Sequence, residues 1–176
     1  MNNSQAMLDL IRTRRSIRKF KPDMLPRDVV DQIAAAGTYA PTARNTQSPI
    51  IVAVTNKDVR DRLSKWNAEV IGSENDPFYG APLALVVLAD KACPNRVYDG
   101  SLVMENLMLA AHALGVGSCW IHRAREVFER PEAKELLKSL GVEGEYEGIG
   151  NCILGYVDGE EPEAAPRKEN WVYHID

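Results

Sequence analysis

A basic segment near the start of the chain offers the first candidate for binding chemistry. The run RTRRSIRKF covers residues 12–20, and an extended backbone would place alternate side chains on one face: Arg14, Ser16, Arg18 and Phe20. Two guanidiniums and a hydroxyl on one face suit a small anion such as phosphate, because a guanidinium binds phosphate oxygens in pairs. A solvated basic surface and a nucleic-acid-binding patch have the same composition. The segment alone therefore leaves these three interpretations open.

A polar loop held between two prolines is the second candidate. The segment APTARNTQSP covers residues 40–49, and its polar side chains include Thr42, Asn45, Thr46, Gln47 and Ser48. Proline fixes the backbone φ angle, and the polar side chains supply donors and acceptors in a small space. The loop could therefore bind the edge of a heterocycle, although an ordinary turn before a strand has a similar composition.

Two further segments carry weaker signals. GVGSCWIH, residues 115–122, combines glycines that permit close approach of the backbone with the large apolar surface of Trp120. The glycines do not complete a G-x-G-x-x-G motif and no P-loop lysine follows, so we expect no phosphate there, and a helix-to-strand turn explains them equally well. Arg167 and Lys168 form a second basic pair, which could complete an anion site begun at Arg14 or could be an ordinary surface pair.

The sequence lacks the patterns typical of side-chain catalysis and of metal binding. Cys93, Cys119 and Cys152 form no C-x-x-C pair, no G-x-S-x-G motif occurs, and the histidines are not at metal-ligand spacing from other ligand types. We therefore expect no metal site and no catalytic acid, base or nucleophile. An anion site and a heterocycle-binding loop without such groups are typical of proteins in which a cofactor carries the chemistry.

These segments must be positioned by a mixture of helices and strands. Apolar periodicity predicts helices over residues 6–14, 26–37, 59–70, 101–114 and 132–140, and strands over 50–55, 83–89, 117–121, 150–157 and 171–175. Asn56 and Asp58 can cap the third helix. Helices and strands do not alternate regularly, so an α+β layered fold is favoured over a doubly wound sheet. The last strand follows about a dozen polar residues and could pair with its own sheet or with a partner chain.

Composition and charge exclude several classes of protein. The chain has 176 residues, of which 45% are hydrophobic, which suits one full core and predicts a single domain over residues 1–176. The 21 basic and 25 acidic residues give a net charge of −4, which counts against a nucleic-acid-binding module. The longest apolar run, residues 81–89, is about half of what a membrane span needs, and the N-terminus has no signal pattern. An odd number of cysteines fits a reducing compartment, so we expect a cytoplasmic protein that binds neither membrane nor nucleic acid.

Taken in order, the segments resemble the nitroreductase family of FMN-dependent oxidoreductases. The resemblance extends over essentially the whole chain and rests on RRSIRKF, APTARNTQ, the helix DGSLVMENLMLAAHALGVGSCWI, GNCILGYV and PRKENW. It implies a three-layer α+β fold, in which helices flank a mixed or antiparallel sheet, and a homodimer with two FMN sites at its interface. The C-terminal strand near Trp171 would then extend to the partner subunit.

The resemblance also implies which residues bind FMN. The segment that holds the phosphate and the ribityl chain is matched by Arg14, Arg15, Ser16 and Arg18, with Arg18 directed to the N1 and O2 edge of the flavin. The loop that reaches the flavin of the other subunit is matched by Pro41, Thr42, Ala43 and Asn45. Asn67 matches an amide at the pyrimidine edge of the flavin. The backbone beside the ring is matched by Cys119, Trp120 and Ile121, and the C-terminal basic pair on the phosphate by Arg167 and Lys168.

The implied activity is hydride transfer from NAD(P)H through flavin N5 to a small-molecule acceptor, such as a nitroaromatic or a quinone, by a ping-pong mechanism. The alternatives are another reaction on the same fold, such as dehalogenation or flavin fragmentation, and a non-enzymatic module that binds a polyanion through residues 12–21. Two features depart from the family pattern. The segment at residues 70–80 is short, which predicts an open pocket, and His122 stands where small residues are common.

Overall fold

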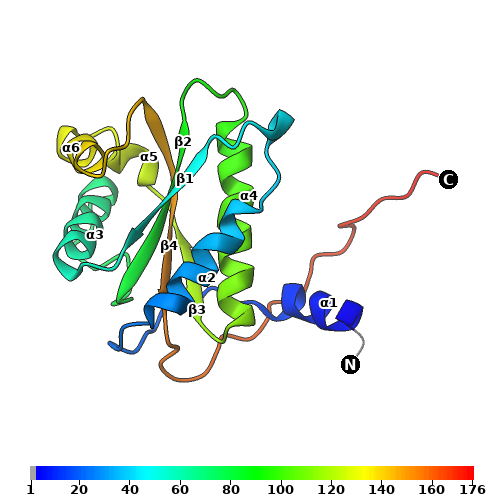
Figure 1. The fold of residues 1–176 in the computed structure, drawn as a ribbon. Coiled ribbons are helices and arrows are strands. Elements are labelled where there is room, and N and C mark those ends of the chain that lie inside the picture. Colours follow the sequence, from blue (N-terminus) through cyan, green and yellow to red (C-terminus); the bar gives the residue numbers. More distant parts are fainter. Residues whose placement is uncertain (1–2) are drawn as a thin grey trace.

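An antiparallel sheet separates two layers of helices (Figure 1). The structure is a computed structural model and describes residues 3–176. The strands are β1 (Pro49–Val54), β2 (Leu83–Asp90), β3 (Gly117–Ile121) and β4 (Tyr146–Gly155), and their order in the sheet is β1-β2-β4-β3. All neighbouring pairs run antiparallel, as an α+β fold allows.

The apolar run at residues 83–89 forms the centre of the sheet because it is covered on both faces. Every residue of β2 except Asp90 is buried. Alternate side chains point to opposite faces, so Ala84, Val86 and Leu88 pack in one core and Leu83, Leu85 and Val87 in the other. The sheet is therefore the middle of three layers.

One helical layer consists of α2 (Arg27–Thr38) and the long helix α4 (Arg96–Ala113), with α1 (Asn3–Thr13) beside the end of α4. The opposite layer consists of α3 (Lys57–Ile71), α5 (Ala124–Val127) and α6 (Pro131–Ser139) (Figure 1). A short 3₁₀ turn, η1, covers Ala43–Asn45. The expected three-layer α+β fold with an antiparallel sheet is confirmed.

The first turn of α3 shows how the sequence sets a helix boundary. The Asn56 side chain accepts a hydrogen bond from the Val59 N–H at 3.1 Å, as predicted, whereas Asp58 lies inside the helix. By contrast, α4 begins at Arg96, five residues before its predicted start. Gly100 explains the difference, because a Cβ there would lie 2.5 Å from the Ile149 side chain, so this glycine permits close packing of α4 on β4 rather than a helix end.

Two expectations about extended segments are wrong. Arg14, Ser16, Arg18 and Phe20 do not share one face, because Phe20 is buried in the core while Arg18 is exposed. The described backbone of this segment pairs with strands only through isolated bridges, Ser16 to Ser118 and Phe20 to Val157, so no regular strand imposes a period of two.

The second correction concerns the C-terminal tail. Residues 171–175 form no strand in the described chain, because the tail leaves the body beyond α1 and meets no strand with which to pair (Figure 1). Its apolar side chains remain exposed: Trp171, Val172, Tyr173 and Ile175. Pairing with a partner subunit stays a prediction.

None of the helices within residues 3–176 combines the length and the apolar character needed to cross a bilayer.

Candidate functional site

The basic segment and the C-terminal tail form one cavity of about 650 Å³, called here the basic cavity. Its lining includes four arginines and one carboxylate, and consists of Ile11, Arg12, Arg14, Arg15, Ser16, Glu163, Ala164, Ala165 and Arg167. The structure therefore brings together four of the residues expected at the phosphate: Arg14, Arg15, Ser16 and Arg167. Lys168 is not among the lining residues, and its ammonium lies 4.9 Å from the centre of the Trp171 ring.

Arg14, one of the residues that line this cavity, has a buried donor that no described residue uses. Its Nη1 atom is buried without a hydrogen-bond partner, and its Nε lies 4.0 Å from a carboxylate oxygen of Glu105. The Arg15 guanidinium, by contrast, donates to the carbonyls of Arg12 and Arg14, both at 2.8 Å. A buried donor without an acceptor costs free energy, so Arg14 is poised for an anionic ligand.

A second cavity, of about 250 Å³, lies beside β3 and is called the β3 cavity. Its lining combines cations, an amide, aromatic rings and apolar groups: Arg18, Asn67, Ile71, Pro77, Tyr79, Cys119, Trp120, Ile121, His122 and Arg123. Five of the expected flavin-binding residues thus gather here, namely Arg18, Asn67, Cys119, Trp120 and Ile121. The chain from Ser16 to Arg18 connects the basic cavity with the β3 cavity, since Ser16 lines the first and Arg18 the second.

Because β3 lies at the edge of the sheet, its backbone N–H and C=O groups can bind a ligand. Its neighbour in the sheet is β4, and on its other side the Ile17 N–H donates to the Ser118 carbonyl at 2.9 Å. The strand then continues past this bridge through Cys119, Trp120 and Ile121 along the cavity. Polar backbone groups at an edge are available to the edge of a heterocycle.

Cys119 is not set up as a nucleophile. Burial raises the pKa of its thiol, and the nearby Arg18 guanidinium, the Ser16 hydroxyl and Arg14 only partly oppose this effect. A thiol with a raised pKa stays protonated at neutral pH and is inert. Cys93 and Cys152 are also free and buried. Burial raises the pKa of the Cys152 thiol, whereas hydrogen bonds with Ser48 and Thr46 lower the pKa of Cys93, which lines neither the basic cavity nor the β3 cavity.

Asn67 lies in the wall of the β3 cavity but is only 1% exposed. Its side chain donates to the Leu63 carbonyl at 2.9 Å and accepts from Asn151 at 3.4 Å. The amide that was expected at the pyrimidine edge therefore already holds α3 to β4. A contact with flavin stays a prediction for this residue.

The polar loop at residues 40–49 lies away from both cavities. It is fastened to the first turn of α4, where the Ala43 N–H donates to the buried carboxylate of Asp99 at 3.0 Å. The basic segment lies at the other end of the same helix, where Thr13 bonds His112 at 2.8 Å (Figure 1). Within one chain, Pro41, Thr42, Ala43 and Asn45 therefore do not join the other expected site residues. Thr42 instead lines a separate cavity of about 440 Å³ between α2 and β1.

This loop is held in an unusual backbone conformation. Arg44, Asn45 and Gln47 have φ angles of 55°, 54° and 48°, in the left-handed region that favours glycine. Its hydrogen bonds include one from the Gln47 N–H to the Thr42 hydroxyl, at 3.0 Å. Strained residues persist only where surrounding contacts fix them, and such residues cluster at binding sites.

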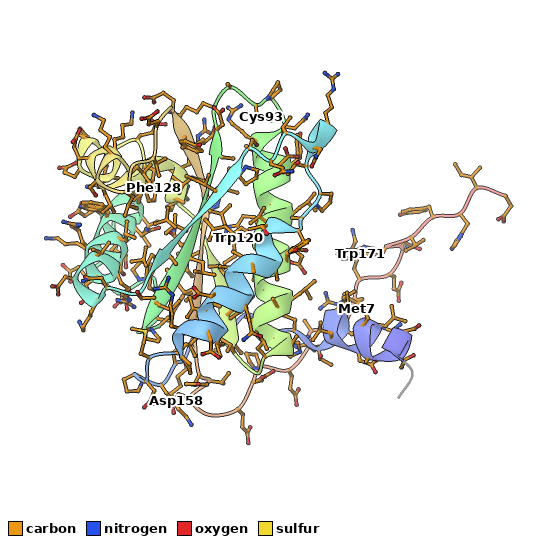
Figure 2. The ribbon with its side chains drawn as sticks, viewed as in Figure 1. Met7, Cys93, Trp120, Phe128, Asp158 and Trp171 are labelled. Atoms are coloured by element: carbon orange, nitrogen blue, oxygen red, sulfur yellow. The ribbon has the colours of Figure 1, made fainter. Side chains whose placement is uncertain are left out.

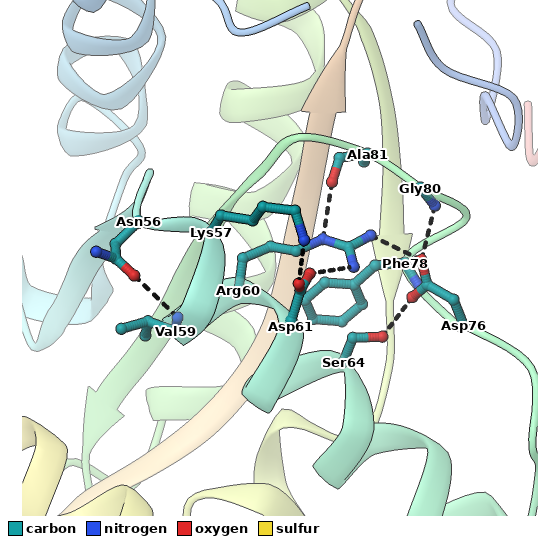
Figure 3. A network of polar contacts seen from close by, with 10 residues as sticks. All are labelled: Asn56, Lys57, Val59, Arg60, Asp61, Ser64, Asp76, Phe78, Gly80 and Ala81. Atoms are coloured by element: carbon teal, nitrogen blue, oxygen red, sulfur yellow. Dashed lines mark hydrogen bonds and ion pairs between the residues drawn. The ribbon is translucent and has the colours of Figure 1, made fainter. Parts of the chain in front are cut away.

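The loop that lines the β3 cavity with Pro77 and Tyr79 is fixed by a polar network around Arg60 and Asp76 (Figure 3). Arg60 is 8% exposed and donates to Asp76 and to the Ala81 carbonyl, both at 2.8 Å. The Asp76 carboxylate also accepts from the backbone N–H groups of Phe78 and Gly80, at 2.8 Å each, and from the Ser64 hydroxyl. The loop after α3 is thereby fixed to the body of the protein.

We expect Asp76 to contribute to stability at neutral pH and to lose this contribution in acid. Burial tends to raise the pKa of its carboxyl, but the hydrogen bonds from Ser64, Arg60, Gly80 and Phe78 outweigh burial and hold it below the ordinary value of 3.8. As pH falls, the unfolded chain therefore takes up the proton first, and the contribution disappears as pH falls below about 4. Asp76→Asn should lower the free energy of unfolding at pH 7 by about 1.5 to 3 kcal/mol, the range for a hydrogen bond to a charged group.

Urea unfolding at pH 7 and pH 3 measures this effect, with Asp31→Asn as control because Asp31 forms an exposed pair with Arg27. The free energy of unfolding of Asp76→Asn should differ from that of the natural chain less at pH 3 than at pH 7. An equal difference at both values would contradict the role of the ionised carboxylate.

Several lining residues of the β3 cavity had no signal of their own in the sequence, among them Ile71, Pro77, Tyr79 and Arg123. The run NDPFYG could have indicated the fixed loop, because an aspartate followed by proline and glycine is typical of a side-chain-closed turn. Only the family resemblance connected residues 70–80 with the pocket, and no local pattern indicates that this turn borders the same cavity as β3.

The chain matches the sequence model described as "Nitroreductase family" over residues 11–156. A curated relative from Archaeoglobus fulgidus, named "Putative NADH dehydrogenase/NAD(P)H nitroreductase", is 30% identical over 159 residues, which cover 87% of this chain and 86% of the relative.

Solved structures give the same result. A nitroreductase with bound FMN from Bacteroides fragilis aligns over 100% of both chains with a TM-score of 0.86 and 27% identity. A nitroreductase with bound FMN from Desulfitobacterium hafniense covers 99% of this chain and 100% of its own, with a TM-score of 0.84 and 26% identity.

Proposed function

Because the chain belongs to the nitroreductase family, we propose that it is an FMN-dependent NAD(P)H oxidoreductase that reduces small aromatic acceptors such as quinones and nitroaromatics. Two similar proteins of known structure hold FMN, and a relative carries the name of an NAD(P)H nitroreductase. The observation that carries the proposal is the buried, unpartnered Nη1 of Arg14, a residue that lines the basic cavity, together with the chain from Ser16 to Arg18, which connects this cavity with the β3 cavity.

The residues present fit FMN at both of its ends. Four arginines of the basic cavity offset the charge of a terminal phosphate. Glu163 is the one carboxylate among the lining residues, so positive charges outnumber negative ones in the cavity. The β3 cavity offers apolar side chains to the faces of a planar ring and backbone groups to its edge. FMN has one phosphate, and the glycines at residues 115–117 complete no dinucleotide-binding fingerprint, so the site favours FMN over a dinucleotide such as FAD.

Arg18 is placed to act on the electronics of the site. Its guanidinium lines the β3 cavity and is near enough to Cys119 to affect the pKa of that thiol. FMN, when bound, supplies hydride transfer through N5. A fixed cation at the pyrimidine edge stabilises negative charge there in a site with little water, so Arg18 should favour the reduced cofactor.

The functional unit that we propose is a homodimer with a single FMN-binding domain per chain. The loop at residues 40–49 lies away from the other expected site residues, so it would complete the site of a partner. Exposed apolar side chains on α1, on α4 and on the tail support such an interface. They are Met7, Leu8 and Ile11 on α1, Val97, Tyr98 and Leu102 on α4, and Trp171, Val172, Tyr173 and Ile175 on the tail. In Figure 2, the labelled Met7 and Trp171 both lie outside the body of the protein.

Steady-state kinetics test the proposed activity. If the flavin carries the hydride and one face of it serves both substrates, NAD(P)H and the acceptor must take turns in one cavity. Initial rates should give parallel double-reciprocal lines, as a ping-pong mechanism requires. Replacing Cys119 or His122 by alanine should lower the activity by less than the roughly 100-fold expected when a general acid is removed.

Intersecting lines would contradict the shared cavity, because they require both substrates to be bound together. A collapse of activity in either variant would show that a catalytic side chain exists.

A further inference from the structure

Tyr79 adopts a backbone conformation that its side chain disfavours. Its φ angle is 52°. The next residue, Gly80, has a φ angle of 72°, which glycine adopts without strain because it has no side chain. For a bulky residue such an angle is an outlier that costs free energy and calls for an explanation. The core does not provide one, because the side chain is 44% exposed.

Asp76 holds this conformation through three consecutive backbone N–H groups. The Phe78 and Gly80 amides donate to its carboxylate at 2.8 Å each, and the Tyr79 amide donates to its carbonyl at 3.1 Å. Phe78 is fully buried and lies under the Arg60 guanidinium, whose centre is 5.4 Å from the ring centroid (Figure 3). The residues on both sides of Tyr79 are thus fixed, and the strained position between them is imposed rather than mobile.

The held position borders the β3 cavity. Tyr79 lines it together with Pro77, Ile71 and the β3 residues Cys119, Trp120 and Ile121. The short loop leaves this cavity accessible, so an exposed ring at its wall can contact a molecule that enters.

We propose that Tyr79 determines acceptor specificity by presenting an aromatic surface on which planar acceptors stack. The inference rests on the proposed function, because it concerns the acceptor that enters the same cavity. Aromatic pairs prefer offset or edge-to-face contact and gain attraction beyond their buried area, whereas an inorganic acceptor such as ferricyanide gains nothing from a ring. The Arg60 and Asp76 network would then be a positioning device, which fixes the backbone that carries the ring so that less ordering is needed on binding.

The test compares variants of the FMN-bound protein with two acceptors, a naphthoquinone and ferricyanide. For Tyr79→Leu, the ratio of kcat/KM for the quinone to that for ferricyanide should fall about three- to tenfold. Tyr79→Phe keeps the ring and should keep the ratio. Tyr79→Gly removes both the ring and the backbone strain, so it should fold at least as well as Tyr79→Ala and lose the same selectivity.

A binding measurement independent of turnover completes the test. A naphthoate, which is planar but not reducible by hydride, should bind the oxidised protein by calorimetry three- to tenfold more weakly in Tyr79→Leu and Tyr79→Gly. Unchanged quinone selectivity and unchanged naphthoate affinity in a yellow, active Tyr79→Leu protein would overturn the inference and leave the proposed function intact. A natural chain that takes up no FMN would overturn both.

Discussion

Replacing Arg14 by alanine is expected to weaken FMN binding by about 1.5 to 3 kcal/mol, which is roughly 10- to 150-fold in Kd. The reason is that Nη1 of Arg14 is buried without a hydrogen-bond partner among the described residues, and that the Glu105 carboxylate lies 4.0 Å from Nε, beyond hydrogen-bond distance. A terminal phosphate would satisfy this donor with a charge-assisted bond, and alanine offers no replacement. Titration of the FMN-free protein with FMN, followed by flavin fluorescence, measures the change.

Arg27→Ala is the matched control, because Arg27 pairs with Asp31 on the surface of α2 and lines neither cavity. It should leave the Kd for FMN unchanged. Equal Kd values for Arg14→Ala and the natural chain would show that the basic cavity does not hold the phosphate.

Removing the chain after Lys168 is expected to abolish the dimer and FMN binding together. This truncation keeps Arg167 in the basic cavity but removes Trp171, Val172, Tyr173 and Ile175. Buried aromatic side chains of interfaces each contribute about 2 kcal/mol or more when they form a hot spot, so the loss should be large. Light scattering gives the mass of the particle, and flavin absorbance gives the FMN content.

Arg167→Ala in the full-length chain is the control, because it removes the cation and keeps the tail. It should weaken FMN binding and leave the dimer intact. A truncated monomer that binds FMN as tightly as the natural chain would contradict a site shared between subunits.

Local signals in the sequence were sufficient for most of the fold. The run at residues 83–89 is apolar without interruption and forms the buried central strand, and Asn56 caps α3 as its side chain predicts. Both features depend on neighbours along the chain. Helix α5 was missed because it is a single turn, set by burial of Ala124 and Val127 rather than by periodicity.

The candidate site could be predicted only as separate groups of residues. The basic run offered an anion site at Arg14 as one interpretation, and the family resemblance implied that backbone near Cys119 lies beside the flavin ring. Neither indicated that the chain from Ser16 to Arg18 joins two cavities. Tyr79 could not be found, because its importance depends on a φ angle and on a wall formed by distant segments. The tail was expected to form a strand because Trp171, Tyr173 and Ile175 alternate, yet alternation needs a neighbouring strand to take effect.

The cofactor itself provides the most direct test of the account. Purified protein, incubated with riboflavin 5′-phosphate and FAD in equal amounts and freed of excess, should be yellow and should release on heating a flavin that co-elutes with FMN, with a stoichiometry near one per chain. The basic cavity and the β3 cavity together predict this result, because they match one phosphate and one ring system. Release of FAD, or a colourless protein that retains no flavin, would contradict the account.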